Sequence, residues 1–262
     1  MATSLATYVD ALAETWSSLA SVCSGLSPAE WETPTELPGW SVKDNVSHVV
    51  GVELFLLGEP YPPHVVPDLP HIRNDAGRWV EVPVDLRRPV PGASVLAELS
   101  DVTARRLAEL RALDEPALEE TVRGVMDFPM KLKHLLGMRV FDSWAHEQDV
   151  RRALGRPGGL TSAAAILSRR RLLLAMSGLV PSAAGRVVVL ETTGALPSVA
   201  TLTLGASYVD GAADAPDVRL VMDFETFVRL GTGRVAYAPG LVSIAGDEGL
   251  AEAFLGAMAI TP

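Results

Sequence analysis

The sequence predicts an α plus α+β chain: an all-helical part to about residue 180, followed by a smaller α+β part over residues 181–262. Two observations support this division. Up to Leu179, apolar residues recur every three or four positions, as on one face of a helix. After Pro181 the pattern becomes strand-like, in short segments rich in β-branched residues and bounded by glycine, proline and aspartate. Such strands, interleaved with two short helices, are typical of a small α+β domain.

Helices are expected in the first part over residues 4–23, from residue 27 for about a turn, and over residues 41–57, 94–113, 130–154 and 161–179. Two of the starts carry a capping box, Ser27 with Glu30 and Ser41 with Asp44, in which each side chain serves the other's backbone. The segment GRPGG at residues 155–159 ends the long helix. Cys23 extends the apolar stripe of the first helix, so we interpret it as a core residue.

Between residues 58 and 93, eight prolines argue against any long regular element. A connection of this length often lines a site. His64 and His71 lie in it and are spare candidates for metal ligands, with exposed loop histidines as the alternative. Further on, the basic triplet at residues 169–171 is expected on the exposed side of its helix, as a solvated or interface face.

The second part is expected to contain strands at residues 186–193, 199–205, 218–223 and 241–247. Helices are expected at residues 224–231 and 248–258. Each of these segments is short and bounded by residues that favour turns.

The composition excludes several classes of protein. The chain has 262 residues, 48% of them apolar, and a net charge of −10, which argues against attraction to nucleic acid or to an anionic membrane. No segment approaches the roughly 20 consecutive apolar residues of a membrane span. The first residues include acids and no basic region, unlike a secretory signal. With Cys23 as its single cysteine, the chain can form no internal disulfide, and we expect a cytoplasmic protein.

Three residues suggest a metal site. Asp142 and His146 lie four positions apart, on one face of the long predicted helix, and His48 lies about two turns into another. Two imidazoles and a carboxylate suit a divalent metal and leave room for a further ligand. This spacing arises by chance about as often as not, so His146 paired with Asp142 on a helix surface is the alternative. His134 is about 12 Å from Asp142 along the helix axis, too far to share an ion.

Asp44 and His48 form a second pair with the same spacing. Asp44 is the third residue of a capping box, where a carboxylate serves the helix N-terminus. A hydrogen bond that Asp44 accepts from a metal ligand is the other interpretation.

Two segments resemble known signatures. LPGWSVKDNVSHVVGVELFLLGE and RVFDSWAHEQDVRRALGRPGG resemble those of the mycothiol-dependent maleylpyruvate isomerase family, part of the DinB-like superfamily of four-helix bundles. The segments MDFETFVRLGTGR and LVSIAGD are similar to the family's small C-terminal domain, which is related to sterol-carrier-like folds. The resemblance implies a metal-binding DinB-like bundle over residues 1–180 and an α+β C-terminal domain over residues 181–262.

The resemblance also implies roles for individual residues. The family's metal ligands fall on His48, Asp142 and His146, with glutamate in the isomerase where this chain has Asp142. The shorter aspartate would require the ion to lie nearer its helix or to be bridged by water. An arginine of the family's C-terminal domain acts near the active site, and its best match is Arg234, with Arg229 second. For either arginine, a structural role at the surface is the alternative.

The implied function is that of a divalent-metal enzyme with mycothiol as its thiol cosubstrate. Zn²⁺ is the expected ion, with nickel or iron open. A thiol bound to such an ion is deprotonated and nucleophilic at neutral pH. It would serve isomerisation or S-transfer on a small electrophile. A non-catalytic metal- or small-molecule-binding protein is the alternative. No nucleic acid or membrane partner is expected, and both a monomer and a homodimer are open.

Overall fold

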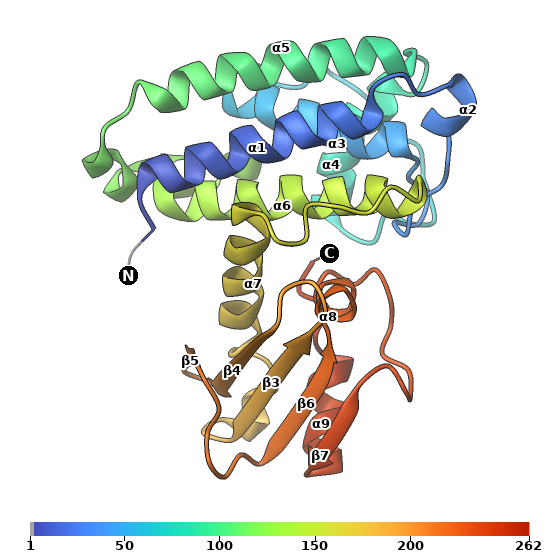
Figure 1. Cartoon of the computed structure of the whole chain (residues 1–262). Coiled ribbons are helices and arrows are strands. Elements are labelled where there is room, and N and C mark those ends of the chain that lie inside the picture. The colour runs from blue at the N-terminus through green and yellow to red at the C-terminus, as the bar shows by residue number, and fades with distance from the viewer. Residues whose placement is uncertain (1–2, 262) are drawn as a thin grey trace. The chain divides into compact units, whose positions relative to one another are not determined.

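A computed structural model describes residues 3–261. The chain divides into two compact units, with the boundary between residues 165 and 166 (Figure 1). The first unit is helical, apart from one small hairpin, and the second combines a sheet with helices. This confirms the predicted fold class.

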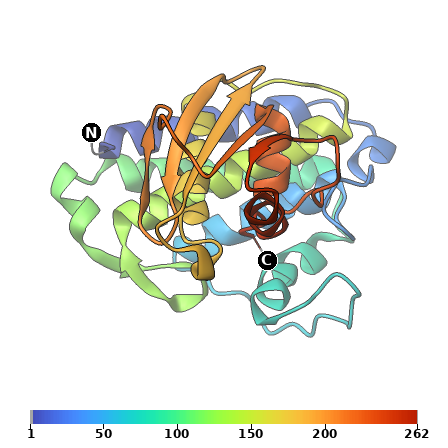
Figure 2. The ribbon, with the colours of Figure 1, turned by 90° about the horizontal axis from the view of Figure 1, so that it is seen from below.

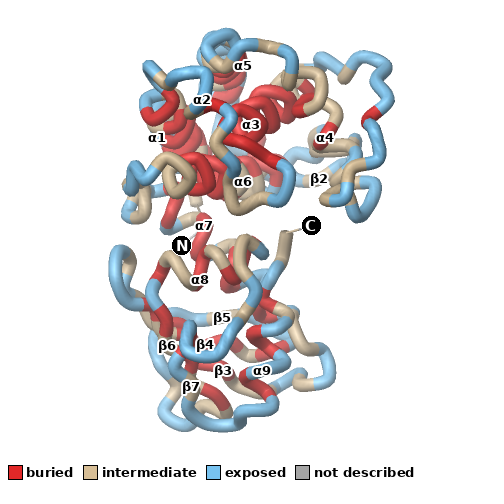
Figure 3. The backbone as a smooth tube through the Cα atoms, turned by 90° about the vertical axis from the view of Figure 1, so that its right-hand side faces the viewer, coloured by how far each residue is buried: buried red, intermediate tan, exposed pale blue. Residues whose placement is uncertain are grey.

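The first unit is a four-helix bundle. Its four long helices are α1 (Leu5–Cys23), α3 (Val42–Leu56), α5 (Gly92–Arg111) and α6 (Leu132–Ala153). Helices α1 and α3 each pack against both α5 and α6. The faces that meet inside the bundle are buried, as Figure 3 shows for α1, α3 and α6. The large apolar side chains buried in the bundle interior are mainly those of Leu, Val and Trp, and their removal from water stabilises the fold.

Side-chain caps define where these helices begin. Ser4 accepts a hydrogen bond from the amide of Thr7 at the start of α1. Both predicted capping boxes are formed, at α2 (Pro28–Trp31) and at α3. The caps satisfy amide groups that have no partner within the helix. The predicted register of α3, and with it the position of His48 on that helix, is therefore correct.

The proline-rich segment contains a helix that the sequence analysis excluded. Helix α4 (Asp75–Arg87) begins at the N-cap Asn74 and includes Pro83. It packs on α3, where a Cβ added to Gly51 would lie only 2.1 Å from the Cβ of Pro83. The absence of a side chain at Gly51 thus makes room for the proline ring, and the packing offsets the lost helical hydrogen bond. The expectation of no long regular element was wrong because it used local propensity alone.

A small hairpin between α5 and α6 was also missed. Strands β1 (Thr121–Arg123) and β2 (Pro129–Lys131) pair antiparallel. The 3₁₀ helix η1 (Glu115–Glu119) precedes β1, and a second 3₁₀ helix, η2 (Val125–Asp127), lies in the turn between the two strands. Strands of three residues are too short to show an alternating pattern. The turn between them holds Met126 and Asp127 at φ of 57° and 64°, unusual values for residues other than glycine.

The second unit is built on a five-stranded sheet. Helix α7 (Ala163–Met176) and the 3₁₀ helix η3 (Pro181–Ala183) precede it. Its strands are β3 (Val187–Thr193), β4 (Ser198–Thr203), β5 (Ser207–Asp210), β6 (Val218–Asp223) and β7 (Ser243–Gly246). They lie in the order β5-β4-β3-β6-β7, and of the neighbouring pairs only β3 and β6 run parallel (labelled in Figure 1 and seen from below in Figure 2). Helices α8 (Phe224–Gly231) and α9 (Glu248–Gly256) confirm the two predicted short helices.

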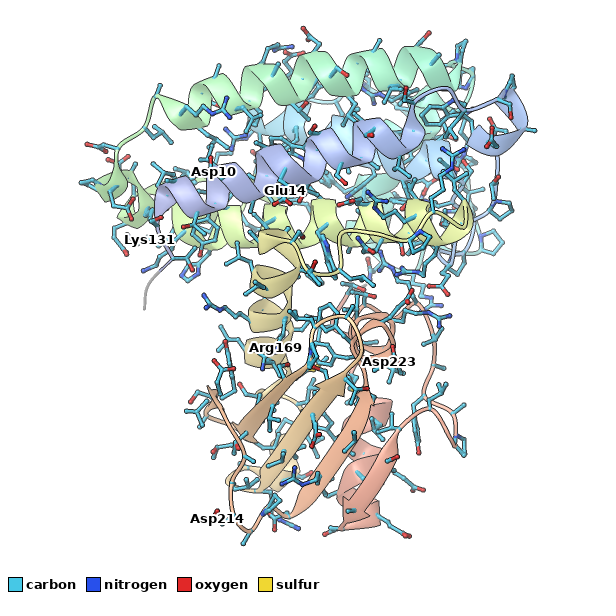
Figure 4. The ribbon with its side chains drawn as sticks, in the orientation of Figure 1. Asp10, Glu14, Lys131, Arg169, Asp214 and Asp223 are labelled. Atoms are coloured by element: carbon cyan, nitrogen blue, oxygen red, sulfur yellow. The ribbon has the colours of Figure 1, made fainter. Side chains whose placement is uncertain are left out.

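The basic triplet is not wholly exposed, contrary to expectation. Arg169, labelled on α7 in Figure 4, is only 8% exposed and pairs with Asp210 at 3.0 Å between Nη1 and Oδ1. Asp210 belongs to β5, the four-residue edge strand that the sequence pattern did not reveal. Because β5 was missed, no partner was available for Arg169, and its burial was not foreseen. Across the described part of the chain, no helix combines the length and apolar character needed to cross a bilayer.

Candidate metal centre

Helices α3 and α6 bring His48, Asp142 and His146 together inside the bundle. The two histidines are buried, at 4% and 6% exposure. The Asp142 side chain is 26% exposed and forms the open side of the cluster. His48 and the Asp142–His146 pair, separated by 94 positions or more in the sequence, therefore meet at one partly exposed point.

The distances within the cluster suit a single ion. Asp142 Oδ2 and Oδ1 lie 3.2 and 3.4 Å from His48 Nε2, and Oδ1 lies 3.7 Å from His146 Nε2. One ligand atom from each residue can be chosen so that all lie within 4.8 Å of one another. Ligands bound tetrahedrally to Zn²⁺ at about 2.0 Å are separated by about 3.3 Å. The donor set and its spacing therefore fit a divalent metal, and the shorter aspartate reaches both imidazoles.

Asn45 orients the His146 ring. Its Nδ2 donates to the carbonyl of Ser41 and to Thr35 Oγ1, so its Oδ1 is left as an acceptor. Oδ1 lies 2.7 Å from His146 Nδ1, which must then carry the proton and donate it. The lone pair of the imidazole is consequently on Nε2, the nitrogen that faces Asp142.

The charges at the centre favour metal binding. Burial lowers the pKa of His48 to about 4 despite the nearby charge of Asp142, so this imidazole is neutral at pH 7. Burial alone would raise the pKa of Asp142. The positive charge of Arg139, with smaller contributions from the two nearby imidazoles, outweighs that effect and holds the pKa of Asp142 well below its usual range. The cluster thus offers one anionic and one unprotonated neutral ligand without a proton having to leave at neutral pH.

An indole covers the two imidazoles. The ring of Trp40 lies 5.3 Å from that of His48 and 5.7 Å from that of His146, measured between centroids. Its Nε1 donates to Oε2 of Glu81, a residue of α4 that is 1% exposed. Trp40 and Asn45 were not identified as site residues from the sequence, although both lie in the LPGW-containing segment next to His48. Nothing in the sequence pattern indicated that Glu81 belongs to the site, because α4, the helix that carries it, was not predicted.

The spare candidates have other partners. His71 Nε2 lies 2.9 Å from Glu81 Oε2, and His64 Nε2 lies 2.6 Å from Asp85 Oδ2. Asp44 Oδ2 accepts hydrogen bonds from the backbone and hydroxyl of Ser41, which confirms its capping role. His134 is exposed on α6. Within residues 3–261, His48, Asp142 and His146 form the one cluster of three possible ligands.

The two arginines proposed from the resemblance belong to the second unit. Arg229 lies in the last turn of α8, and its carbonyl accepts the amide of Arg234 at 2.8 Å. Arg234 Nη1 donates to the carbonyl of Thr232 at 2.7 Å. A role for either arginine at the metal centre stays a prediction.

Replacing Asn45 with alanine is expected to lower metal affinity by about 10- to 100-fold, the usual effect of losing the partner of a ligating histidine. Without Oδ1, the His146 ring can rotate and change tautomer. Isothermal titration with Zn²⁺ measures the change. Asn74→Ala is the control, since it also replaces an asparagine that caps a helix, at the exposed start of α4, and leaves His146 and its partners unchanged. Equal affinities for the two variants would contradict the orienting role of Asn45.

Comparison with known proteins adds independent findings. Residues 12–151 match the family model described as the mycothiol maleylpyruvate isomerase N-terminal domain. A crystal structure of the mycothiol-dependent maleylpyruvate isomerase is similar over 93% of both chains, with a TM-score of 0.60 and 16% identity. A histidine-to-alanine mutant of that enzyme is similar over the same shares, at a TM-score of 0.57 and 16% identity. At this identity the two structures show a shared fold. The search of curated proteins gives no match.

Proposed function

Because the chain belongs to the family of the mycothiol maleylpyruvate isomerase N-terminal domain, we propose that it is a divalent-metal-dependent enzyme that uses mycothiol to isomerise a small electrophilic substrate. The family match, over residues 12–151, confirms the resemblance seen in the sequence. The observation that carries the proposal is the meeting of His48, Asp142 and His146 at ligand distances, from two separate helices.

The chain supplies no thiol of its own for this chemistry. Cys23 is fully buried, and burial raises the pKa of its thiol to about 12, so it is neither accessible nor ionised at neutral pH. The nucleophile must therefore come from a small molecule. A divalent ion such as Zn²⁺, held by the three ligands, would lower the pKa of a coordinated thiol and supply a thiolate at neutral pH.

The protein's own residues hold and shield the reactants. The partly exposed carboxylate of Asp142 leaves an approach to the centre, while Trp40 and the bundle core keep water from the two imidazoles. Addition of the thiolate to a conjugated double bond gives a single bond that can rotate. Elimination of the same thiolate then restores the double bond in the trans form, with no net change in atoms. In this proposal Arg234, with Arg229 as the second candidate, binds a carboxylate of the substrate or a polar part of the thiol.

The test is to purify the protein without chelator, measure its metal content, and follow cis-to-trans isomerisation of an unsaturated carboxylate by absorbance. About one divalent ion per chain is expected, with turnover that requires both the metal and mycothiol. Removing the ion with a chelator should abolish turnover, and restoring Zn²⁺ should recover it. Absence of bound metal would contradict the proposal. Metal and thiol binding without isomerisation, but with thioether formation, would indicate S-transfer. Binding without any reaction would indicate the non-catalytic alternative.

A further inference from the structure

Arg139 links two buried carboxylates, one of which belongs to the metal centre. Its Nε donates to Oε1 of Glu53 at 2.7 Å, and its Nη1 donates to Oδ2 of Asp142 at 2.8 Å. Arg139 and Glu53 are 2% and 1% exposed. Glu53 lies on α3 with His48, and Arg139 lies on α6 with Asp142 and His146. The same two helices are therefore joined at the centre and again by this bridge.

The bridge makes the two oxygens of Asp142 unequal. Oδ2 accepts the charged hydrogen bond from Arg139, and a charge-assisted bond of this kind draws electron density toward the donor. Oδ2 is also 3.2 Å from His48 Nε2, whereas Oδ1 lies 3.4 Å from that nitrogen and 3.7 Å from His146 Nε2, within reach of both imidazoles. Of the hydrogen bonds found for residues 3–261, none to Oδ1 comes from an arginine. Oδ1 is consequently the better ligand for a cation between the imidazoles.

We propose that Arg139, held in place by Glu53, is a positioning residue that restricts Asp142 to one ligating oxygen and so keeps a coordination position open for the thiol. This inference rests on the proposed function. With Oδ2 engaged by Arg139, the three side chains provide three ligand atoms. If both oxygens of Asp142 were free to bind, the carboxylate could occupy the position that the thiol needs.

The energetics of the bridge agree with a role beyond folding. Arg139 Nη2 is buried and has no hydrogen-bond partner within the described residues. Arg106 lies 3.3 Å from Glu53, between Nε and Oε2, and adds a second buried cation. Taking such charges out of water is costly, and a well-packed apolar pair often stabilises a protein as much. The arrangement is therefore better explained by its effect on Asp142 than by its contribution to stability.

The shape of the bridge also requires arginine. The guanidinium presents Nε and Nη1 in a fixed fork, which lets one side chain hold two carboxylates in defined positions. Arg139 precedes Asp142 by three residues, so both project from the same face of α6. The short aspartate keeps its carboxylate near that helix, within reach of Arg139. A lysine would retain the charge but could not reproduce the fork.

Replacement of the native ion by Co²⁺ tests the inference by visible absorption, independently of activity. The wild-type protein should give the intense bands of four-coordinate Co²⁺ when mycothiol is bound. Arg139→Gln and Glu53→Gln should still bind Co²⁺. Their absorption bands should be several-fold weaker, because a second oxygen of Asp142 enters the coordination sphere, and their affinity for the thiol should be about tenfold lower. Arg139→Lys should fall between wild type and Arg139→Gln.

Arg87→Gln is the matched control, because it removes a mostly buried arginine whose hydrogen bonds go to Glu98 and to the carbonyl of Pro83 and not to Glu53 or Asp142. Its Co²⁺ spectrum and thiol affinity should stay close to wild type. Circular dichroism establishes that each variant is folded, and if Arg139→Gln is not, Glu53→Gln and Arg139→Lys decide the question. If the folded Arg139 and Glu53 variants keep the wild-type spectrum and the wild-type thiol affinity, the inference about Arg139 is wrong. The proposed function would not be affected by that result. Failure of the wild-type protein to bind Co²⁺ would overturn the proposed function and the inference with it.

Discussion

Replacing His146 with alanine should remove stoichiometric metal from the protein and lower its affinity for Zn²⁺ by more than about 100-fold. The loss should exceed the 10- to 100-fold effect of changing a residue that only supports a ligand, because a ligand atom itself is lost. Two ligands, His48 and Asp142, would remain, and Asp142 also pairs with Arg139. Elemental analysis and isothermal titration measure the effect, and thiol-dependent turnover should fall with the metal content.

His134→Ala is the control for this experiment. His134 lies on the same helix, α6, but is exposed and is not part of the cluster. Its removal should leave both metal content and affinity unchanged. His48→Ala should behave like His146→Ala. If either histidine of the cluster can be removed without loss of bound metal, the ion is held elsewhere and the proposed centre is wrong.

Replacing Trp16 with alanine should destabilise the bundle by about 3–5 kcal/mol, the usual cost of truncating a buried aromatic residue to alanine. Trp16 is 2% exposed on α1, and its Nε1 donates to Ser143 Oγ at 3.0 Å. Ser143 follows Asp142 on α6, so this contact fixes the helix that carries two of the proposed ligands. Urea unfolding followed by far-ultraviolet circular dichroism measures the change in the free energy of unfolding.

Two further variants separate the contributions in that experiment. Trp16→Phe keeps most of the ring and loses the hydrogen bond to Ser143, so it should cost less than alanine. Phe128→Ala removes an aromatic side chain that is 62% exposed and should change stability little. A cost for Trp16→Ala no greater than that for Phe128→Ala would show that the α1–α6 contact does not stabilise the bundle.

Most helices of the bundle could be predicted because their signals are local. Capping boxes, apolar periodicity and the GRPGG stop lie within the segments that they define. Helix α4 could not be predicted, because Pro83 is accommodated by Gly51, a residue 32 positions earlier on a different helix. The short strands β1, β2 and β5 were missed for a similar reason, since partners in a ladder stabilise them and their own patterns are weak.

The features of the site can likewise be separated into those that the local sequence predicts and those that depend on the folded structure. The spacing of Asp142 and His146 on one helix is a property of the sequence, and so is the capping role of Asp44. By spacing alone, however, the pair was as compatible with a helix surface as with a metal centre. The burial of both histidines and the approach of His48 from α3 rule out an exposed helix-surface pair and place the three side chains in one cluster, while metal binding there stays a prediction.

By itself, the sequence determined the fold class, the helix that carries each candidate ligand and, through its two signature segments, the family. Tertiary structure decided which side chains meet: Asn45 with the imidazole of His146, Trp40 over both histidines, and Arg139 between Glu53 and Asp142. The physical reason is the range of the forces involved. Backbone hydrogen bonding and apolar periodicity act over a few residues, whereas the orientation and charge of a ligand depend on side chains that only folding brings within about 3 Å.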